Sequence, residues 1–213
     1  MGKIMALNYT EKQLQEINAS LSGKTPEEIV SWALGVAKKP LITTNFRPYE
    51  GSILHLTTSQ LKDLDVVWCD TGYNTPQTYR HAEALIQQLN LNVHLYVPKQ
   101  TAAHRDVVMG IPQIEDPQHK IFTEQVKLEP FARAMRTHKP DVWFTNLRKG
   151  QTAFRDSIDV VSLGADGVLK VSPFYNWSDE ALDTYNQKHG IPNEFKYFDP
   201  TKVLGNRECG LHA

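Results

Sequence analysis

A cysteine close to the end of the sequence has the surroundings of a reactive thiol. Cys209 stands between Arg207 and His212, and cationic neighbours favour the thiolate, which is the nucleophilic form of cysteine. Gly210 leaves the sulfur accessible, and a polar, glycine-containing segment is a poor place for a cysteine that only packs in a core. We therefore interpret Cys209 as a candidate nucleophile. Cys69 lies in an apolar stretch, and we interpret it as structural.

Polar side chains follow an apolar run that begins at position 40. Thr43, Thr44, Asn45 and Phe46 come at the end of this run and precede a helix start near Gly51. Hydroxyl groups and unpaired backbone N–H groups at a helix N-terminus form an anion site. A polar turn between a strand and a helix explains the same residues, because no complete glycine-rich phosphate motif is present. Both interpretations stay open at this point.

A second loop gathers positive charge. Arg148, Lys149 and Arg155 fall within eight residues, with Gln151 among them, directly after another apolar run. Arginine side chains grip phosphate or sulfate oxygens in a bidentate manner. The alternative is a solvated charged loop, which is the common fate of such a cluster.

A third polar loop follows the apolar run at 65–69. It contains Asp70, Thr71 and Gly72. Asp70 can accept hydrogen bonds from a ribose or from loop amides, and a turn-forming aspartate is the alternative.

The sequence predicts no metal site. Two cysteines in the whole chain exclude a disulfide framework, a four-cysteine zinc site and an all-cysteine iron–sulfur cluster within one chain. Eight histidines are scattered, and none stands at zinc-ligand spacing with the cysteines.

The elements that must position these loops form an alternating pattern of strands and helices. Thr10 with Gln13, and Thr25 with Glu28, predict capping boxes at the start of two helices. Strands are predicted over 40–44, 65–69, 92–97 and 141–145, with a further pair at 160–162 and 167–171, and helices over about 51–60, 75–89, 129–136 and 178–189. This order predicts an α/β fold with a doubly wound, mostly parallel sheet. Ligands bind such sheets outside the carboxyl ends of the strands, where all three polar loops are expected.

Composition describes an ordinary soluble chain. Of the 213 residues, 23 are Lys or Arg and 24 are Asp or Glu, so charge gives no sign of a nucleic-acid partner, and no apolar run reaches the length of a membrane span. The presence of only two cysteines in the sequence fits a reducing, cytoplasmic location. We predict a nucleotide-binding α/β domain over 1–190, with a helical extension at 1–39, and a mobile C-terminal tail at 191–213 that carries Cys209.

Several stretches resemble the sulfonucleotide reductase family, in the order in which that family has them. They are ECGLH at 208–212, DTGY at 70–73 followed by TPQTY at 75–79, KLEP at 127–130 with Arg133 and Ala134, and Leu147, Arg148, Gln151 and Arg155 in the basic loop. The resemblance covers about 40–213. The terminal pentapeptide is the most specific part, because it fixes a cysteine in a short motif at the chain end.

The resemblance implies an adenine nucleotide alpha hydrolase-like fold and thiol-dependent reduction of 3′-phosphoadenylyl sulfate (PAPS) in sulfate assimilation. Cys209 is implied as the nucleophile that forms an S-sulfonate, with Arg207 and His212 beside it, and thioredoxin or glutaredoxin as the external reductant. The expected substrate-binding residues are Thr43, Thr44, Asn45, Phe46, Asp70, Thr71, Gly72, Arg148, Gln151 and Arg155. With two cysteines, the chain is similar to the branch that has no iron–sulfur cluster. A homodimer is expected from the family alone.

The sequence departs from the family pattern in places that concern the substrate. The first loop reads Phe46-Arg47-Pro48-Tyr49-Glu50, where the family has small residues, and the region before Arg207 is short. Arg47 either meets an extra phosphate or narrows the pocket. Three alternatives therefore stay open: the same reaction on adenylyl sulfate (APS), an adenylyltransferase on the same fold, and a nucleotide-binding module without chemistry.

Overall fold

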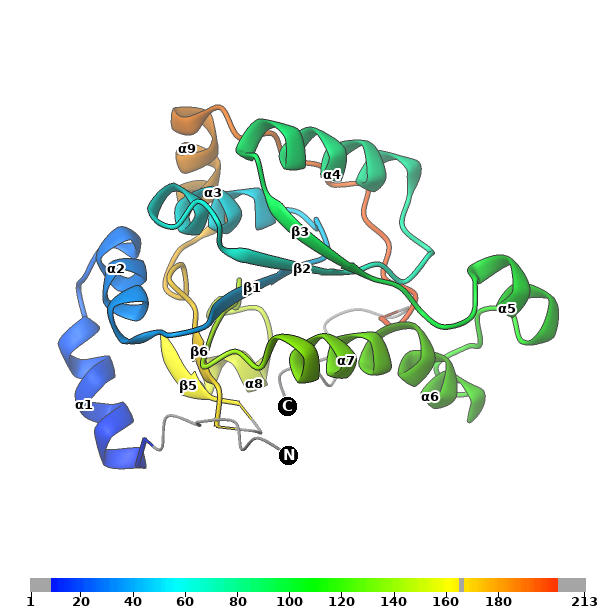
Figure 1. The fold of residues 1–213 in the computed structure, drawn as a ribbon, viewed down its shortest axis with the longest axis horizontal. Helices are drawn as coiled ribbons and strands as arrows, with labels where there is room; N and C mark the ends of the chain where they lie inside the picture. The colour runs from blue at the N-terminus through cyan, green and yellow to red at the C-terminus, as the bar shows by residue number, and fades with distance from the viewer. Residues whose placement is uncertain (1–8, 165–166, 203–213) are drawn as a thin grey trace.

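The computed structural model describes residues 9–164 and 167–202, and its centre is a six-stranded sheet with the order β3-β2-β1-β4-β6-β5 (Figure 1). Every neighbouring pair is parallel except β5 and β6, which run antiparallel. The strands are β1 (Pro40–Thr44), β2 (Asp65–Cys69), β3 (Asn92–Tyr96), β4 (Val142–Phe144), β5 (Val161–Leu163) and β6 (Leu169–Val171). The doubly wound, mostly parallel sheet predicted from the sequence is confirmed.

The order in which successive strands are added to the sheet reverses at β1, in the middle of the sheet. β1, β2 and β3 extend the sheet toward one edge, and β4 then returns to the other side of β1, where Ile42 lies opposite Phe144. The loops that leave β1 and β4 therefore diverge, and parallel sheets bind ligands at such a switch point.

Local signals in the sequence explain the helices. The helices are α1 (Glu11–Leu21), α2 (Pro26–Val36), α3 (Glu50–Gln60), α4 (Pro76–Leu89), α5 (Ala102–Val108), α6 (Gln118–Thr123), α7 (Glu129–His138), α8 (Ala153–Asp156) and α9 (Asp179–His189). Both predicted capping boxes are present, since the side chains of Thr10 and Thr25 accept hydrogen bonds from the N–H groups of Gln13 and Glu28. Within the described ranges, no helix is long and apolar enough to cross a membrane.

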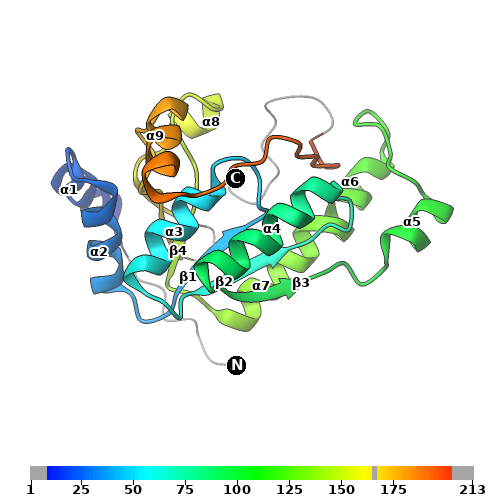
Figure 2. The same cartoon turned by 90° about the horizontal axis from the view of Figure 1, so that it is seen from above.

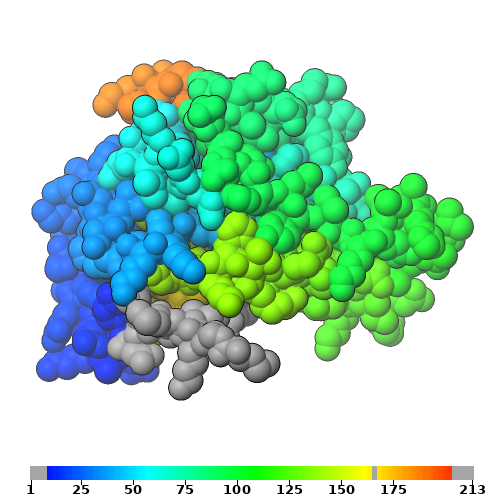
Figure 3. Space-filling model, viewed as in Figure 1, coloured from blue at the N-terminus to red at the C-terminus, as the bar shows by residue number. Residues whose placement is uncertain are grey.

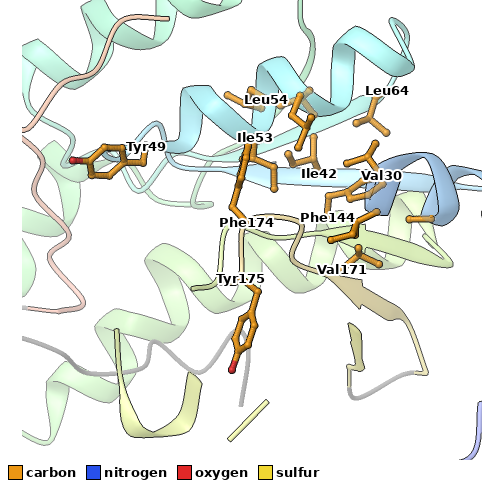
Figure 4. Packing of buried hydrophobic residues seen from close by; sticks show 14 of the residues in the cluster. Val30, Ile42, Tyr49, Ile53, Leu54, Leu64, Phe144, Val171, Phe174 and Tyr175 are labelled. Carbon is orange, nitrogen blue, oxygen red and sulfur yellow. The ribbon is translucent and has the colours of Figure 1, made fainter. Parts of the chain in front are cut away.

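Helices cover the two faces of the sheet unequally. α3, α4 and α9 pack together on one face, while α7 crosses the other and contacts β2 and β3 (Figure 1; Figure 2 gives the view from above). Alternate residues of one strand serve the two faces, so Ile42 of β1 joins the larger apolar cluster and Leu41 the smaller one. In Figure 4, Ile42, Ile53 and Phe144 gather between α3 and the sheet.

One end of the molecule was not predicted from the sequence. α5 and α6 form a projection beyond β3, visible at the right of Figure 3, and Val107 and Val108 on α5 are exposed. Between α6 and α7 lies a π-helical turn, η1 (Glu124–Leu128). Pro130 supplies the reason, because it lacks the N–H that an α-helix needs at that position, and the turn widens before it.

Candidate active site

A cavity of about 230 Å³ opens at the carboxyl edge of the sheet, where its direction reverses. Four parts of the chain line it: the end of β1 with the loop after it, the end of β2 with η1 and α7, the loop after β4 with α8, and the segment after α9. The lining residues are Thr43, Thr44, Asn45, Arg47, Pro48, Glu50, Cys69, Lys127, Phe131, Thr145, Asn146, Arg155, Tyr197, Asp199 and Lys202. The sequence-based expectation for an α/β sheet places a ligand at this edge.

The first loop is organised around a buried carboxylate. Oε2 of Glu50 accepts hydrogen bonds from the hydroxyl of Thr44 at 2.8 Å, the N–H of Asn45 at 2.8 Å and the N–H of Arg47 at 3.3 Å. Glu50 is only 5% exposed although it lines the cavity. Phe46 has a left-handed backbone, with φ of 52°, which turns the loop so that these donors converge.

Two residues of this loop that we predicted to bind substrate, Phe46 and Thr43, contact tryptophan side chains of the protein itself. The ring of Phe46 is 1% exposed and packs edge-on against Trp68, so its side chain belongs to the core and not to the cavity. Thr43 lines the cavity, and its hydroxyl accepts a hydrogen bond from the indole N–H of Trp143 at 3.0 Å.

Arg47 links the first loop to the loop after β4. Its Nε lies 2.7 Å from Oε1 of Glu50, and its Nη2 donates to the carbonyl of Asn146 at 3.3 Å. The side-chain amide of Asn146 in turn donates to the carbonyl of Tyr49 at 3.1 Å. The two loops on either side of the switch point are thus held at a fixed separation.

The basic loop sends its two arginines in different directions. Arg155 lines the cavity and donates from Nη1 to the amide oxygen of Gln151, and Tyr175 holds the Arg155 carbonyl through its hydroxyl at 2.7 Å. Arg148 lies outside the cavity lining: its Nη2 is 2.5 Å from Asp179, and its guanidinium covers the ring of Tyr49 at 5.3 Å. Of these two cations, only Arg155 is directly placed to meet a ligand in the cavity.

The Asp70 loop is held by its own hydrogen bonds. Oδ1 of Asp70 accepts from the N–H of Gly72, the amide of Asn74 and the hydroxyl of Tyr79 at 2.9–3.0 Å. Burial and the neighbouring negative charge of Asp70 raise the pKa of Tyr79 to about 12, so the phenol stays a donor. Thr71 is buried, and its hydroxyl accepts from the N–H of Tyr73. Asp70 thus acts here as the turn-forming aspartate that the sequence analysis left open.

A segment of the chain after α9 closes the cavity from the outside. Lys127 of η1 and Asp199 form a buried ion pair, with Nζ 2.5 Å from Oδ2 and side-chain exposures of 3% and 8%. Burial alone would raise the pKa of Asp199, but the attraction of Lys127 and the hydrogen bonds of Lys127 and Thr201 lower it below its usual value. Tyr197 and Lys202 also line the cavity from this segment.

The two cysteines differ as far as the structure describes them. Cys69 at the end of β2 is 6% exposed, and burial raises the pKa of its thiol to about 12, which fits its interpretation as structural. The three predicted catalytic residues, Arg207, Cys209 and His212, lie outside the described residues.

Three residues that shape the cavity were missed as site residues in the sequence. Glu50, Lys127 and Asp199 are charged and buried, and a buried charge needs a partner. Lys127 stands in the KLEP stretch and Glu50 in the first loop, both quoted in the sequence analysis, but no local pattern marked either of them, or Asp199, as part of the site. A separate group, Asp65 with His94 and His138, has ligand atoms within 4.8 Å of one another, but it lies at the opposite edge of the sheet, where β2 begins.

Known proteins share this architecture over nearly the whole chain. The sequence is 30% identical to the phosphoadenosine 5′-phosphosulfate reductase of Cronobacter sakazakii, over 97% of this chain and 96% of that protein. The solved phosphoadenylyl-sulfate reductase from Candida auris, a phosphate complex, superposes with a TM-score of 0.78 at 22% identity, covering 88% of this chain and 91% of that one.

A more distant structure shares the fold alone. The FMN adenylyltransferase from Candida glabrata superposes with a TM-score of 0.57 at 10% identity, over 90% of this chain and 62% of that one. The fold is therefore the adenine nucleotide alpha hydrolase-like fold named in the sequence analysis. The profile of the phosphoadenosine phosphosulfate reductase domain matches residues 41–210, a range that holds Cys209 and every strand described above except the first residue of β1. On that match the chain belongs to the phosphoadenosine phosphosulfate reductase domain family.

Proposed function

We propose that this protein reduces PAPS to sulfite and adenosine 3′,5′-bisphosphate, with Cys209 as nucleophile. The observation that carries the proposal is the family match, which extends through Cys209 and covers the strand ends that line the cavity. The lining of this cavity contains four cations, Arg47, Lys127, Arg155 and Lys202, and two carboxylates, Glu50 and Asp199, and this excess of positive charge suits the anionic end of a sulfonucleotide.

The reaction divides into two steps. In the first, the Cys209 thiolate attacks the sulfur of the substrate, an S–S bond forms, and the bond between sulfur and the phosphate oxygen breaks. The leaving nucleotide keeps that electron pair. In the second, one thiol of thioredoxin or glutaredoxin attacks Sγ of the enzyme S-sulfonate and releases sulfite, and its second thiol resolves the mixed disulfide. The dithiol supplies both electrons.

The side chains in the cavity suit the first step by their charge. Arg155 and Lys127 both line the cavity and can neutralise the oxygens on which negative charge gathers as the nucleotide leaves. Arg207 and His212 have the charge to favour the thiolate of Cys209. Thr43, Thr44 and Asn45 line the same edge of the cavity, where the hydroxyl of Thr44 and the N–H of Asn45 donate to Glu50.

The proposal includes no bound cofactor. The whole sequence has two cysteines, which cannot supply the four thiolates of an iron–sulfur cluster. We propose that the electrons come from an external thiol. We propose thioredoxin or glutaredoxin as the reducing partner. We also propose that the protein assembles as a homodimer.

The test measures sulfite release by the purified protein with thioredoxin, thioredoxin reductase and NADPH. PAPS and APS are compared side by side, with Cys209→Ser as the control. Sulfite from PAPS that is lost in the variant would support the proposal. Sulfite from APS alone would keep the mechanism and overturn the choice of substrate. Nucleotide binding without sulfite from either compound would favour a binding protein without reductase activity.

A further inference from the structure

The first loop has the form of an anion site that the chain itself already fills. The N–H groups of Asn45 and Arg47 and the hydroxyl of Thr44 converge on a single oxygen, Oε2 of Glu50. Successive backbone N–H groups around a left-handed residue, here Phe46, make a concave site with partial positive charge. In this chain the concave site holds the carboxylate of Glu50, which follows the three donor residues by three to six positions in the sequence.

The charge on Glu50 matters to the cavity as well as to the loop. The second oxygen, Oε1, is 2.7 Å from Nε of Arg47, so one cation of the cavity wall is compensated before any ligand enters. Arg47 and Glu50 both line the cavity, and the side chain of Glu50 is 7% exposed. A charge pair with little water around it is weakly screened, and its field therefore reaches into the cavity.

A second Glu–Arg pair in the molecule serves as a comparison. Glu129 and Arg133 on α7 are 3.1 Å apart, with side-chain exposures of 23% and 34%, and neither lines the cavity. Their contact is the usual pairing of neighbouring turns of a helix, which needs no ligand to explain it. Glu50 differs because three further donors, the hydroxyl of Thr44 and the N–H groups of Asn45 and Arg47, point at it.

We propose that Glu50 is a specificity-determining residue: its carboxylate occupies the oxyanion position of the first loop and lowers the affinity of the cavity for tetrahedral anions. A sulfate or phosphate group of the substrate must then compete with this internal anion or bind toward Lys127 and Arg155. The inference deepens the proposed function, since it assumes that the cavity receives the anionic end of a sulfonucleotide. It also gives a physical role to the bulky first loop.

The test uses inorganic sulfate as the probe and compares wild type, Glu50→Gln and Glu129→Gln by isothermal titration calorimetry. Glutamine has nearly the shape of glutamate but no charge. Loss of one charge from a site that offers charge-assisted hydrogen bonds is expected to tighten sulfate binding about tenfold in Glu50→Gln. Glu129→Gln, which removes the same charge away from the cavity, should bind sulfate as wild type does.

Unchanged or weaker sulfate binding by folded Glu50→Gln would overturn the proposal, because it would make Glu50 only a support for the loop. If Glu50→Gln does not fold, Glu50→Asp tests the same idea, because the shorter side chain withdraws the carboxylate from the three donors and leaves Arg47 in the cavity wall. Sulfate should then bind more tightly than in wild type, and equal or weaker binding would contradict the proposal.

Sulfate binding separates this inference from the proposed reaction. Tighter binding by Glu50→Gln in a protein that releases no sulfite would uphold the role of Glu50 and reject the reductase. Sulfite release with unchanged sulfate binding in the variant would do the reverse.

Discussion

The cavity has two walls that are built in different ways. In the first loop, Glu50 draws its hydrogen-bond donors from the six residues before it, so that wall is a local structure. The segment after α9 has no strand or helix up to residue 202, and distant residues hold it in place. Asn193 accepts from the N–H of Tyr49, and Asp199 pairs with Lys127.

This difference indicates which of the two walls can be displaced by substitutions elsewhere in the fold. A local loop forms from its own sequence, whereas the terminal segment is positioned only after η1, α3 and α4 are in place. At the start of α4, the hydroxyls of Thr75, which caps the helix, and of Thr78 both donate to the carbonyl of Lys196. We therefore expect the terminal wall to be the more sensitive of the two, because single substitutions far away in the sequence release it. Beyond it the chain continues to Cys209.

We expect the two cysteines to differ most in their effect on sulfite release. Cys209 follows the terminal wall in the sequence, and Cys69 lies at the end of β2. Cys209→Ser should reduce sulfite release by at least about 1,000-fold, since the hydroxyl is a far weaker nucleophile. Cys69→Ala should retain sulfite release, because burial raises the pKa of that thiol to about 12 and keeps it protonated. Loss of activity in Cys69→Ala with an unchanged circular dichroism spectrum would contradict this division of roles.

The next effect concerns the buried ion pair that anchors the terminal wall. Asp199→Asn leaves Lys127 buried without its counter-charge, which should cost about 3–5 kcal/mol in the free energy of unfolding, measured by urea denaturation. Glu129→Gln breaks a more exposed pair and should cost no more than about 1 kcal/mol.

A double variant sharpens this comparison. Lys127→Met combined with Asp199→Leu removes both charges and should recover most of the stability that Asp199→Asn loses. It should not recover sulfite release, because a cation of the cavity is gone. Equal stability of Asp199→Asn and wild type would mean that the pair does not anchor this wall.

The same pair predicts a dependence on pH. The pKa of Asp199 is lowered in the folded protein, so its stabilisation is present above the unfolded pKa of about 3.9 and is lost as the pH falls through the folded value. The stability difference between wild type and Asp199→Asn should therefore be full at pH 7 and shrink below about pH 4. A difference that stays constant down to pH 3 would argue against the carboxylate as its source.

The smallest effect tests the contact between the two walls. Asn193→Ala removes the acceptor of the Tyr49 N–H and should cost about 1 kcal/mol, read as a lower midpoint of urea denaturation. If Asn193→Ala lowers the free energy of unfolding as much as Asp199→Asn does, the first loop and the terminal segment are more strongly coupled than their separate hydrogen bonds and ion pair indicate.

The sequence predicted those parts of the fold that have a local cause. The capping residues Thr10 and Thr25 place two helix starts, and alternating apolar runs place the strands of the sheet. The projection of α5 and α6 was missed, because Val107 and Val108 are exposed apolar residues that break the usual pattern of buried and exposed positions.

The site was predicted only as far as its loops. Parallel strands that alternate with helices bring Thr44 and Arg155 to one edge of the sheet, and this follows from topology. The direction of each side chain depends on contacts between distant residues, so the ion pair that turns Arg148 toward Asp179 could not be read from spacing. The partnership of Lys127 and Asp199 spans 72 positions and left no local pattern.

The most direct test of the central claim is to trap the covalent step at Cys209. The protein is incubated with PAPS in the absence of any thiol, digested, and analysed by mass spectrometry. We expect one sulfonate group on the peptide that contains Cys209, none on the peptide that contains Cys69, and loss of the adduct with release of sulfite when thioredoxin is added. Sulfite formation without an adduct on Cys209, or an adduct on Cys69, would contradict it.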